Sequence, residues 1–273
     1  MQQVALVTGA SSGIGEATVR SLLGAGYTVY AAARRVERME GLAHDGARIL
    51  ALDVTDDASL TDGVRKVLAE AGRVDVLVNN AGYGSFGALE DVPIDEARRQ
   101  FDVNVFGLAR LTQLLLPGMR ERRSGTIVNV SSIGGKFYEP LGSWYHATKF
   151  AVEGLSDSLR IELRKFGIRV VVIQPGPILS EWSGIAQTTL LAASAGGPYA
   201  NSARRVAGVL QTADRPGVGS PPAVVADTIL HAVQSRRPAP RYPVGRGAKF
   251  LMALRRILPD RAFDLLVRAI YRH

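Results

Sequence analysis

The chain has 273 residues, no cysteine and 47% hydrophobic residues, which suits one large domain with a substantial core. The absence of cysteine excludes a disulfide framework, thiolate metal ligands and a cysteine nucleophile, and four scattered histidines argue against a zinc site. The net charge of +8 arises entirely between residues 236 and 273, where ten Lys and Arg accompany two Asp. Because the rest of the chain is balanced, a nucleic-acid-binding core is not expected, and we predict no metal site.

The N-terminal sequence MQQVALVTGA lacks the basic segment and long apolar run of a secretory signal. No stretch of about 18 uncharged apolar residues is present to span a bilayer. A cytoplasmic protein is therefore expected.

Apolar runs alternate with helical segments up to about residue 176. Strands are predicted at residues 3–7, 28–33, 48–54, 74–78, 125–132 and 168–177, with helices between most of them. The runs are nearly continuous rather than alternating, which indicates strands buried on both faces. This pattern predicts a single doubly wound α/β domain of Rossmann type, with a parallel sheet, over residues 1–235.

Two segments depart from this pattern. Residues 181–220 are rich in small residues and poorly periodic, before a helical pattern returns at 221–233. Since ligands of open α/β sheets bind beyond the carboxyl ends of the strands, we predict that 181–220 is an irregular substrate lid; the alternative is a mobile surface loop.

The second segment, residues 236–273, is predicted to be a basic amphipathic extension. Apolar residues recur at helical spacing on both sides of Pro259, with arginines between them. Such helices can lie peripherally on an anionic membrane. We favour the alternative that they cap the domain or pack on a second subunit.

The stretch from Thr8 to Gly15, TGASSGIG, lies between the first strand and the first helix. Glycines allow the backbone to turn tightly and to approach a pyrophosphate, and the helix N-terminus supplies N–H groups and a positive dipole end. A Gly-rich turn in this context predicts a dinucleotide site.

The second strand runs into Arg34 and Arg35, and no acidic residue occurs before Glu37. An acid at this point would bind the ribose 2′-hydroxyl of NAD, whereas a guanidinium suits the 2′-phosphate of NADP. NADP(H) is therefore favoured over NAD(H), the alternative being a pair of solvated arginines.

Tyr145 and Lys149 are separated by four residues at the start of a long helical pattern, so they share a helix face. A nearby ammonium stabilises a phenolate and brings a tyrosine closer to general acid–base work. Ser132, at a strand end, could stabilise the charge that develops on the same substrate oxygen. Asn104 is a mediocre helix former inside a helical pattern, which indicates a polar element within the fold. His146 is interpreted as structural.

These motifs, together with Asp53-Val54, Asn79-Asn80-Ala81-Gly82 and Pro175-Gly176, occur in an order that resembles the short-chain dehydrogenase/reductase family over about residues 1–235. Within that family, residues 132–135, 145–163 and 241–245 look closest to the hydroxysteroid-dehydrogenase and retinol-dehydrogenase-like branch.

The resemblance implies roles for individual positions. Tyr145 would be the general acid in reduction and the base in oxidation. Lys149 would lower its pKa and hold the nicotinamide ribose, Ser132 (with Ser131 as a rival) would orient the substrate oxygen, and Asn104 would hold a water of a proton relay. The cofactor contacts would be Gly9, Ser11, Ser12, Gly13, Ile14 and Gly15 at the phosphates, Arg34 and Arg35 at the 2′-phosphate, Asp53 and Val54 at the adenine, Asn80, Ala81 and Gly82 at the adenine ribose, and Pro175, Gly176 and Ile178 at the nicotinamide.

The predicted function is that of an NADP(H)-dependent oxidoreductase that interconverts a ketone or aldehyde and an alcohol, on a lipophilic steroid-, retinoid- or lipid-like substrate. One alternative is a 3-oxoacyl-thioester reductase; another, from a different class, is a non-catalytic NADP(H)-sensing protein. Trp144 and Trp182 either line an apolar pocket or are simply partly buried. The resemblance also implies a homodimer or homotetramer.

Overall fold

The computed structural model describes residues 2–212, 215 and 217–271. Within this part of the chain seven strands form one sheet, in the order β3-β2-β1-β4-β5-β6-β7, and all neighbouring strands are parallel. The predicted doubly wound α/β fold is thereby confirmed. The strands are β1 (Val4–Thr8), β2 (Thr28–Ala33), β3 (Arg48–Ala51), β4 (Val76–Asn79), β5 (Gly125–Val130), β6 (Ile168–Pro175) and β7 (Arg241–Val244).

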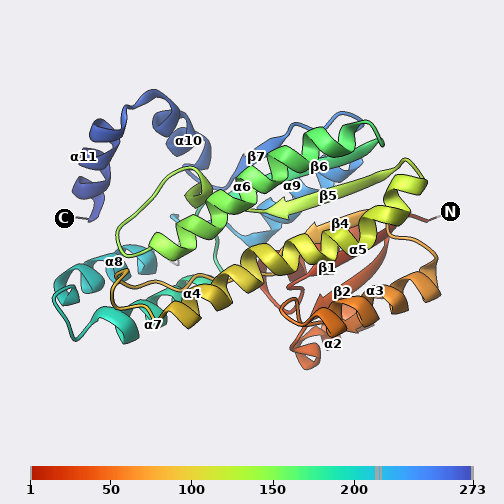
Figure 1. Cartoon of the computed structure of the whole chain (residues 1–273), viewed down its shortest axis with the longest axis horizontal. Helices are drawn as coiled ribbons and strands as arrows, with labels where there is room; N and C mark the ends of the chain where they lie inside the picture. The colour runs from red at the N-terminus through yellow and green to blue at the C-terminus, as the bar shows by residue number, and fades with distance from the viewer. Residues whose placement is uncertain (1, 213–214, 216, 272–273) are drawn as a thin grey trace.

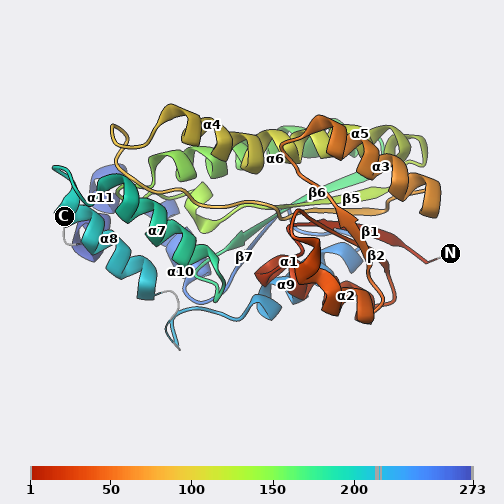
Figure 2. The ribbon, with the colours of Figure 1, turned by 90° about the horizontal axis from the view of Figure 1, so that it is seen from below.

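Helices cover both faces of the sheet (Figures 1 and 2). One face is covered by α3 (Asp57–Ala71), α4 (Ile94–Phe101), α5 (Gly107–Glu121) and α6 (Ser143–Arg164), and the other by α1 (Gly13–Gly24), α2 (Glu40–His44) and α9 (Pro222–Gln234). Short turns of helix lie at Val36–Met39, Asp102–Phe106 and Ile133–Gly135.

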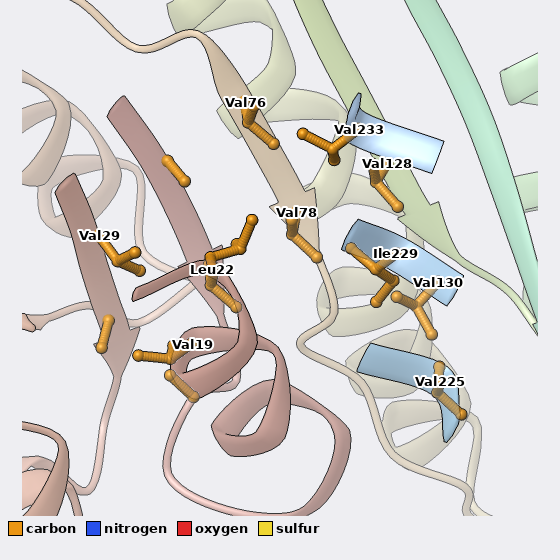
Figure 3. Packing of buried hydrophobic residues seen from close by; sticks show 14 of the residues in the cluster. Val19, Leu22, Val29, Val76, Val78, Val128, Val130, Val225, Ile229 and Val233 are labelled. Atoms are coloured by element: carbon orange, nitrogen blue, oxygen red, sulfur yellow. The ribbon is translucent and has the colours of Figure 1, made fainter. Parts of the chain in front are cut away.

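A valine-rich core joins the sheet to the α1 and α9 layer. Figure 3 shows Val19 and Leu22 of α1, and Ile229 of α9, directed toward strand valines such as Val78 and Val128. Every residue of β1, β4 and β5 is buried. Burial on both faces explains why these strands are continuous apolar runs.

The seventh strand, β7, was not predicted. It lies inside the predicted C-terminal extension and pairs with β6 through four residues, so the sheet continues beyond residue 235. Its sequence RYPV is short, with an arginine and a proline, which is tolerated because it is an edge strand. The extension is therefore part of the domain rather than separate from it.

The segment 181–220 is largely helical, so the prediction that it is irregular was wrong, while its role as a substrate lid stays a prediction. It forms α7 (Trp182–Ser194) and α8 (Ala200–Thr212), which pack together. The buried residues of α7 are Ser183, Ala186, Leu190 and Ser194, at helical spacing. Because most of this buried face is serine and alanine, the pattern does not appear as an apolar stripe.

The tail continues from β7 into α10 (Ala248–Ile257) and α11 (Asp260–Tyr271). Phe263, Val267 and Tyr271 of α11 are buried in a cluster shared with α7 and α8. Of the two favoured alternatives, capping of the domain agrees with this packing (Figure 2), and packing on a second subunit stays a prediction. None of the described helices is long and apolar enough to cross a membrane.

A close approach at Gly107 offers a test of this packing. A Cβ at Gly107 would lie 2.4 Å from the carbonyl oxygen of Val54, so Gly107→Ala should lower the free energy of unfolding by about 1–3 kcal/mol. A control, Gly208→Ala in the exposed part of α8, meets no atom within 4 Å and should raise it by about 0.5–1 kcal/mol. Urea denaturation of both variants measures this; shifts in the same direction would contradict the packing of α5 on the Val54 loop.

Candidate active site

A cavity of about 1120 Å³ runs along the carboxyl ends of the strands and under α7 and α8. Most of the predicted site residues line it. These are Gly9, Ser11, Ser12, Gly13, Ile14, Arg34, Arg35, Asp53, Val54, Asn80, Ala81, Gly82, Ser132, Tyr145, Lys149, Pro175, Gly176 and Ile178. Of the predicted set, Gly15 and Asn104 do not line the cavity.

Gly15 instead lies behind the Gly-rich loop, where a Cβ would come within 2.2 Å of the Gly9 carbonyl oxygen. Its role in the structure is to let α1 approach the loop. Gly9 and Gly13 have positive φ angles of 66° and 56°, which favour glycine. The side chain of Ser12 makes no capping hydrogen bond to α1. The loop thus presents the helix N-terminus to the cavity, which fits a phosphate group.

Hydrogen bonds between β1 and the end of β4 fix the shape of this loop. The Thr8 hydroxyl accepts from the backbone N–H groups of Asn80 and Ala81, each at 3.1 Å. The Asn80 side-chain amide donates to the Thr8 carbonyl oxygen at 2.9 Å. The amide of Asn80 therefore binds the loop itself, in addition to any contact with a cofactor.

Arginines gather beside the Gly-rich loop. Arg35 donates to the Ser11 hydroxyl and to Glu181, both at 3.3 Å, and Arg38 donates to Glu181 at 3.1 Å. Arg34 lies farther out, 4.0 Å from Asp53. Of the two predicted arginines, Arg35 is the one held against the loop. The prediction missed Arg38, although its spacing of three residues from Arg35 is visible in the sequence.

Tyr145 and Ser132 face each other at the other end of the site. Burial raises the pKa of Tyr145 above its usual value, a hydrogen bond from Ser132 lowers it, and the charge of Glu139 raises it. The backbone N–H of Gly134 donates to the Ser132 hydroxyl at 3.0 Å and orients it. The rival Ser131 has a buried hydroxyl with no hydrogen-bond partner among the described residues. The geometry therefore favours Ser132.

Lys149 lies beneath Tyr145 on the same face of α6. Its ammonium donates to the Val130 carbonyl oxygen at 3.1 Å and is 6.0 Å from the Tyr145 ring centroid. Burial lowers the pKa of Lys149 to about 8, against an opposing effect of Glu153. That Lys149 lowers the pKa of Tyr145 stays a prediction, because burial prevails at the tyrosine here.

Asn104 occupies a π-helical turn between α4 and α5. Its side chain accepts from the N–H of Tyr83 at 3.0 Å and donates to the Thr148 hydroxyl at 3.0 Å. It lies close to Lys149, since a Cβ on Gly82 would be 3.0 Å from Asn104 Oδ1 and 3.7 Å from Lys149 Nζ. Its role in a proton relay stays a prediction.

His146 is structural, as predicted. Its Nε2 accepts from the N–H of Glu139 at 3.1 Å, so Nδ1 carries the proton and donates to the Gly134 carbonyl oxygen at 2.8 Å. The two tryptophans differ. Trp182 lines the cavity, with its ring centroid 5.0 Å from that of Tyr145, whereas Trp144 packs against Phe101 outside the cavity lining.

Glu139 and Tyr271 also line the cavity and were missed. The Tyr271 hydroxyl donates a hydrogen bond to Glu139. The two residues are 132 positions apart in the sequence, so no local sequence pattern predicts their contact.

The comparisons with known proteins agree with this geometry. The family model described as short chain dehydrogenase matches residues 3–189. The chain belongs to the short-chain dehydrogenase/reductase family. It is 37% identical over 269 residues to the probable short-chain type dehydrogenase/reductase VdlC of Helicobacter pylori, covering 98% of this chain and 97% of the relative. It is 35% identical to the 3-ketodihydrosphingosine reductase of Bacteroides thetaiotaomicron, covering 98% of each chain.

Solved structures lead to the same family. A short-chain dehydrogenase from Streptomyces avermitilis is 36% identical, with a TM-score of 0.82 over 99% of this chain and 97% of that chain. A metagenomic short-chain oxidoreductase in complex with NADP is 29% identical, with a TM-score of 0.69 over 88% and 95%. A family member from Burkholderia phymatum in complex with NAD is 25% identical, with a TM-score of 0.80 over 98% and 95%. Structural neighbours thus bind NADP or NAD.

The pKa of Lys149 gives a pH prediction. With a pKa of about 8, the ammonium that would stabilise a Tyr145 phenolate is present below pH 8 and is lost above it. The value of kcat/KM for carbonyl reduction should therefore fall as pH rises through about 8, since this parameter reports groups of the free enzyme. Initial rates at varied pH measure it. Lys149→Arg, if active, should move the decline to higher pH, and a wild-type profile flat to pH 10 would contradict the assignment.

Proposed function

We propose that the chain is an NADP(H)-dependent oxidoreductase that interconverts a lipophilic ketone or aldehyde and its alcohol, with Tyr145 as the general acid in reduction. The observation that carries this proposal is the cavity itself. It joins Tyr145 and Ser132, which both line it, to the Gly-rich loop beside Arg35. A nicotinamide cofactor bound along this path would supply or accept the hydride.

The protein's own residues would handle the proton and the oxygen. In reduction Tyr145 would protonate the carbonyl oxygen, and Ser132 would hydrogen-bond to that oxygen as negative charge develops. The raised pKa of Tyr145 keeps its hydroxyl protonated at neutral pH, which is the form that reduction requires. Lys149 would stabilise the phenolate that remains.

The arginines beside the Gly-rich loop support NADP(H) over NAD(H). Arg35 is already held toward Ser11, and Arg34 and Arg38 add positive charge nearby. A 2′-phosphate could replace the Glu181 carboxylate as the acceptor for Arg35. NAD carries a hydroxyl in place of this phosphate and so lacks the charged acceptor that suits these guanidinium groups.

Aromatic and apolar side chains support a lipophilic substrate. Phe86, Phe137, Trp182 and Leu210 line the substrate end of the cavity, and a relative at 35% identity is named for a ketosphingoid lipid. The 3-oxoacyl-thioester alternative is less favoured because carboxylates of Asp91 and Glu139 line the same end and would repel an acidic substrate. The gathering of Ser132, Tyr145 and Lys149 favours an enzyme over a cofactor sensor. The resemblance to the hydroxysteroid- and retinol-dehydrogenase branch, the homodimer or homotetramer, and the membrane contact through the tail stay predictions.

Tyr145→Phe tests the chemistry. Removing the hydroxyl should lower kcat by about 100-fold or more, as expected for a lost general acid, while the affinity for NADPH stays within about twofold. Initial rates with a panel of lipophilic ketones and an NADPH titration measure the two effects. Tyr242→Phe is the control, since Tyr242 lies on the edge strand β7 and does not line the cavity. Unchanged turnover in Tyr145→Phe would favour the sensor.

Arg35→Ala tests the cofactor preference without requiring turnover. Loss of a charge-assisted contact to the 2′-phosphate should weaken binding of 2′,5′-ADP by about 10- to 100-fold, and binding of 5′-AMP should change little. Isothermal titration calorimetry compares the two ligands. Arg65→Ala, in an exposed ion pair with Asp62, is the matched control. An equal loss of affinity for both ligands would contradict the assignment of Arg35 to the 2′-phosphate.

A further inference from the structure

The substrate end of the cavity contains a carboxylate that the proposed reaction does not use. Glu139 lines the cavity, yet its side chain is only 11% exposed. One of its carboxylate oxygens accepts a hydrogen bond from Tyr271 of α11. The other lies 3.8 Å from Nε2 of His146.

The charge of this carboxylate is not balanced by those neighbours. Nε2 of His146 accepts a hydrogen bond from the Glu139 N–H, so in this arrangement Nε2 has no proton to donate to the carboxylate. Burial, together with the negative charge and the hydrogen bond of Glu139, raises the pKa of Tyr271, so Tyr271 is a neutral donor. Among residues 2–212, 215 and 217–271, no lysine or arginine forms a salt bridge with Glu139.

A second carboxylate faces the same space. Asp91 also lines the cavity, and its Oδ2 atom is buried with no hydrogen-bond partner among the described residues. The aromatic rings of Phe86 and Trp182 pack on Tyr145, with ring centroids 5.5 Å and 5.0 Å from that of Tyr145. The substrate end thus combines apolar walls with uncompensated negative charge, a combination that suits a lipophilic cation.

Glu139 is also close to the reacting centre. The His146 ring connects the two, since its centroid is 5.6 Å from that of Tyr145 and its Nε2 is 3.8 Å from the Glu139 carboxylate. The charge of Glu139 contributes to the raised pKa of Tyr145. Glu139 and Tyr145 therefore line one cavity and both lie against His146, so a single substrate can reach both.

We propose that Glu139, positioned by Tyr271, binds a substrate ammonium group, so that the substrate is a lipophilic amino ketone and the product the corresponding amino alcohol. This inference rests on the proposed carbonyl reduction. The ammonium stays protonated and is not consumed. The carbonyl carbon gains the hydride of the nicotinamide cofactor, and the carbonyl oxygen gains the Tyr145 proton. The bound ammonium would also offset the Glu139 charge that opposes formation of the Tyr145 phenolate.

A binding experiment tests the site without turnover. Trp144→Phe leaves Trp182 as the sole tryptophan, since the chain contains two, and Trp182 lines the cavity. Its fluorescence should report dodecylamine, which is protonated at pH 7, binding about 10-fold or more tightly than dodecanol. In the same background Glu139→Gln should remove that difference.

The matched control is Asp264→Asn. Asp264 accepts a hydrogen bond from Tyr138 at 2.8 Å, so it is another tyrosine–carboxylate contact that holds α11, but it does not line the cavity. Asp264→Asn should preserve the preference for dodecylamine. Equal affinities for dodecylamine and dodecanol in the Trp144→Phe protein, or the same loss of dodecylamine binding in both carboxamide variants, would overturn the proposal.

Kinetics separate this inference from the proposed function. Wild type should reduce a long-chain 2-amino-3-ketone with a higher kcat/KM than the same ketone without the amino group. Glu139→Gln should lower kcat/KM for the amino ketone by about 10- to 100-fold and should not lower it for the neutral ketone. Turnover of both ketones at equal kcat/KM would contradict the proposed ammonium site and support the proposed carbonyl reduction. If neither ketone is reduced and dodecylamine still binds more tightly than dodecanol, the proposed reaction is contradicted and the cation site is supported.

Discussion

The site depends first on the close approach of β1, α1 and the end of β4. A Cβ on Gly9 would lie 2.9 Å from Ala81 Cα, and one on Gly15 would lie 2.2 Å from the Gly9 carbonyl oxygen. No side chain fits in these gaps, so the loop can lie flat against the neighbouring strand end. Thr8 and Asn80 then connect the two strands by hydrogen bonds. The parallel sheet brings the ends of β2, β5 and β6 to the same edge, and the remaining site residues follow from that edge.

At the catalytic end the dominant physical effect is burial. It disfavours the charged forms of both Tyr145 and Lys149, raising the pKa of the tyrosine and lowering that of the lysine to about 8. The two shifts oppose the simple picture in which a charged lysine lowers the pKa of its neighbour. They leave a protonated tyrosine next to a lysine that titrates close to neutral pH. Nearby charges then influence how readily Tyr145 gives up its proton. The charge of Glu139 is one of them, since it raises the pKa of Tyr145.

Most of the residues predicted from the sequence line the cavity, because the signals that point to them are local. The Gly-rich loop is contiguous, Tyr145 and Lys149 share one helix turn, and the buried strands are continuous apolar runs. The prediction failed where burial uses small residues or where contacts join distant segments. Ser183 and Ser194 bury a helix face that does not look apolar, and Glu181 meets Arg35 across 146 positions. Likewise β7 is too short and polar to be recognised without its partner β6.

Chemistry and specificity come from different parts of the chain. The Gly-rich loop and the residues proposed to handle the proton lie before residue 176, at strand ends and on α6, where the sheet holds them rigidly. Trp182 and Leu210 lie on α7 and α8, and Tyr271 comes from the end of α11. Substitutions in the later helices can therefore reshape the substrate end without disturbing the pairing of the strands. The tail contributes to both parts: β7 forms an edge strand of the sheet, and α11 places the Tyr271 hydroxyl on the Glu139 carboxylate. Loss of α11 would expose Glu139 to water. Solvent would then screen the charge of Glu139, and the effect of that charge on the pKa of Tyr145 would weaken.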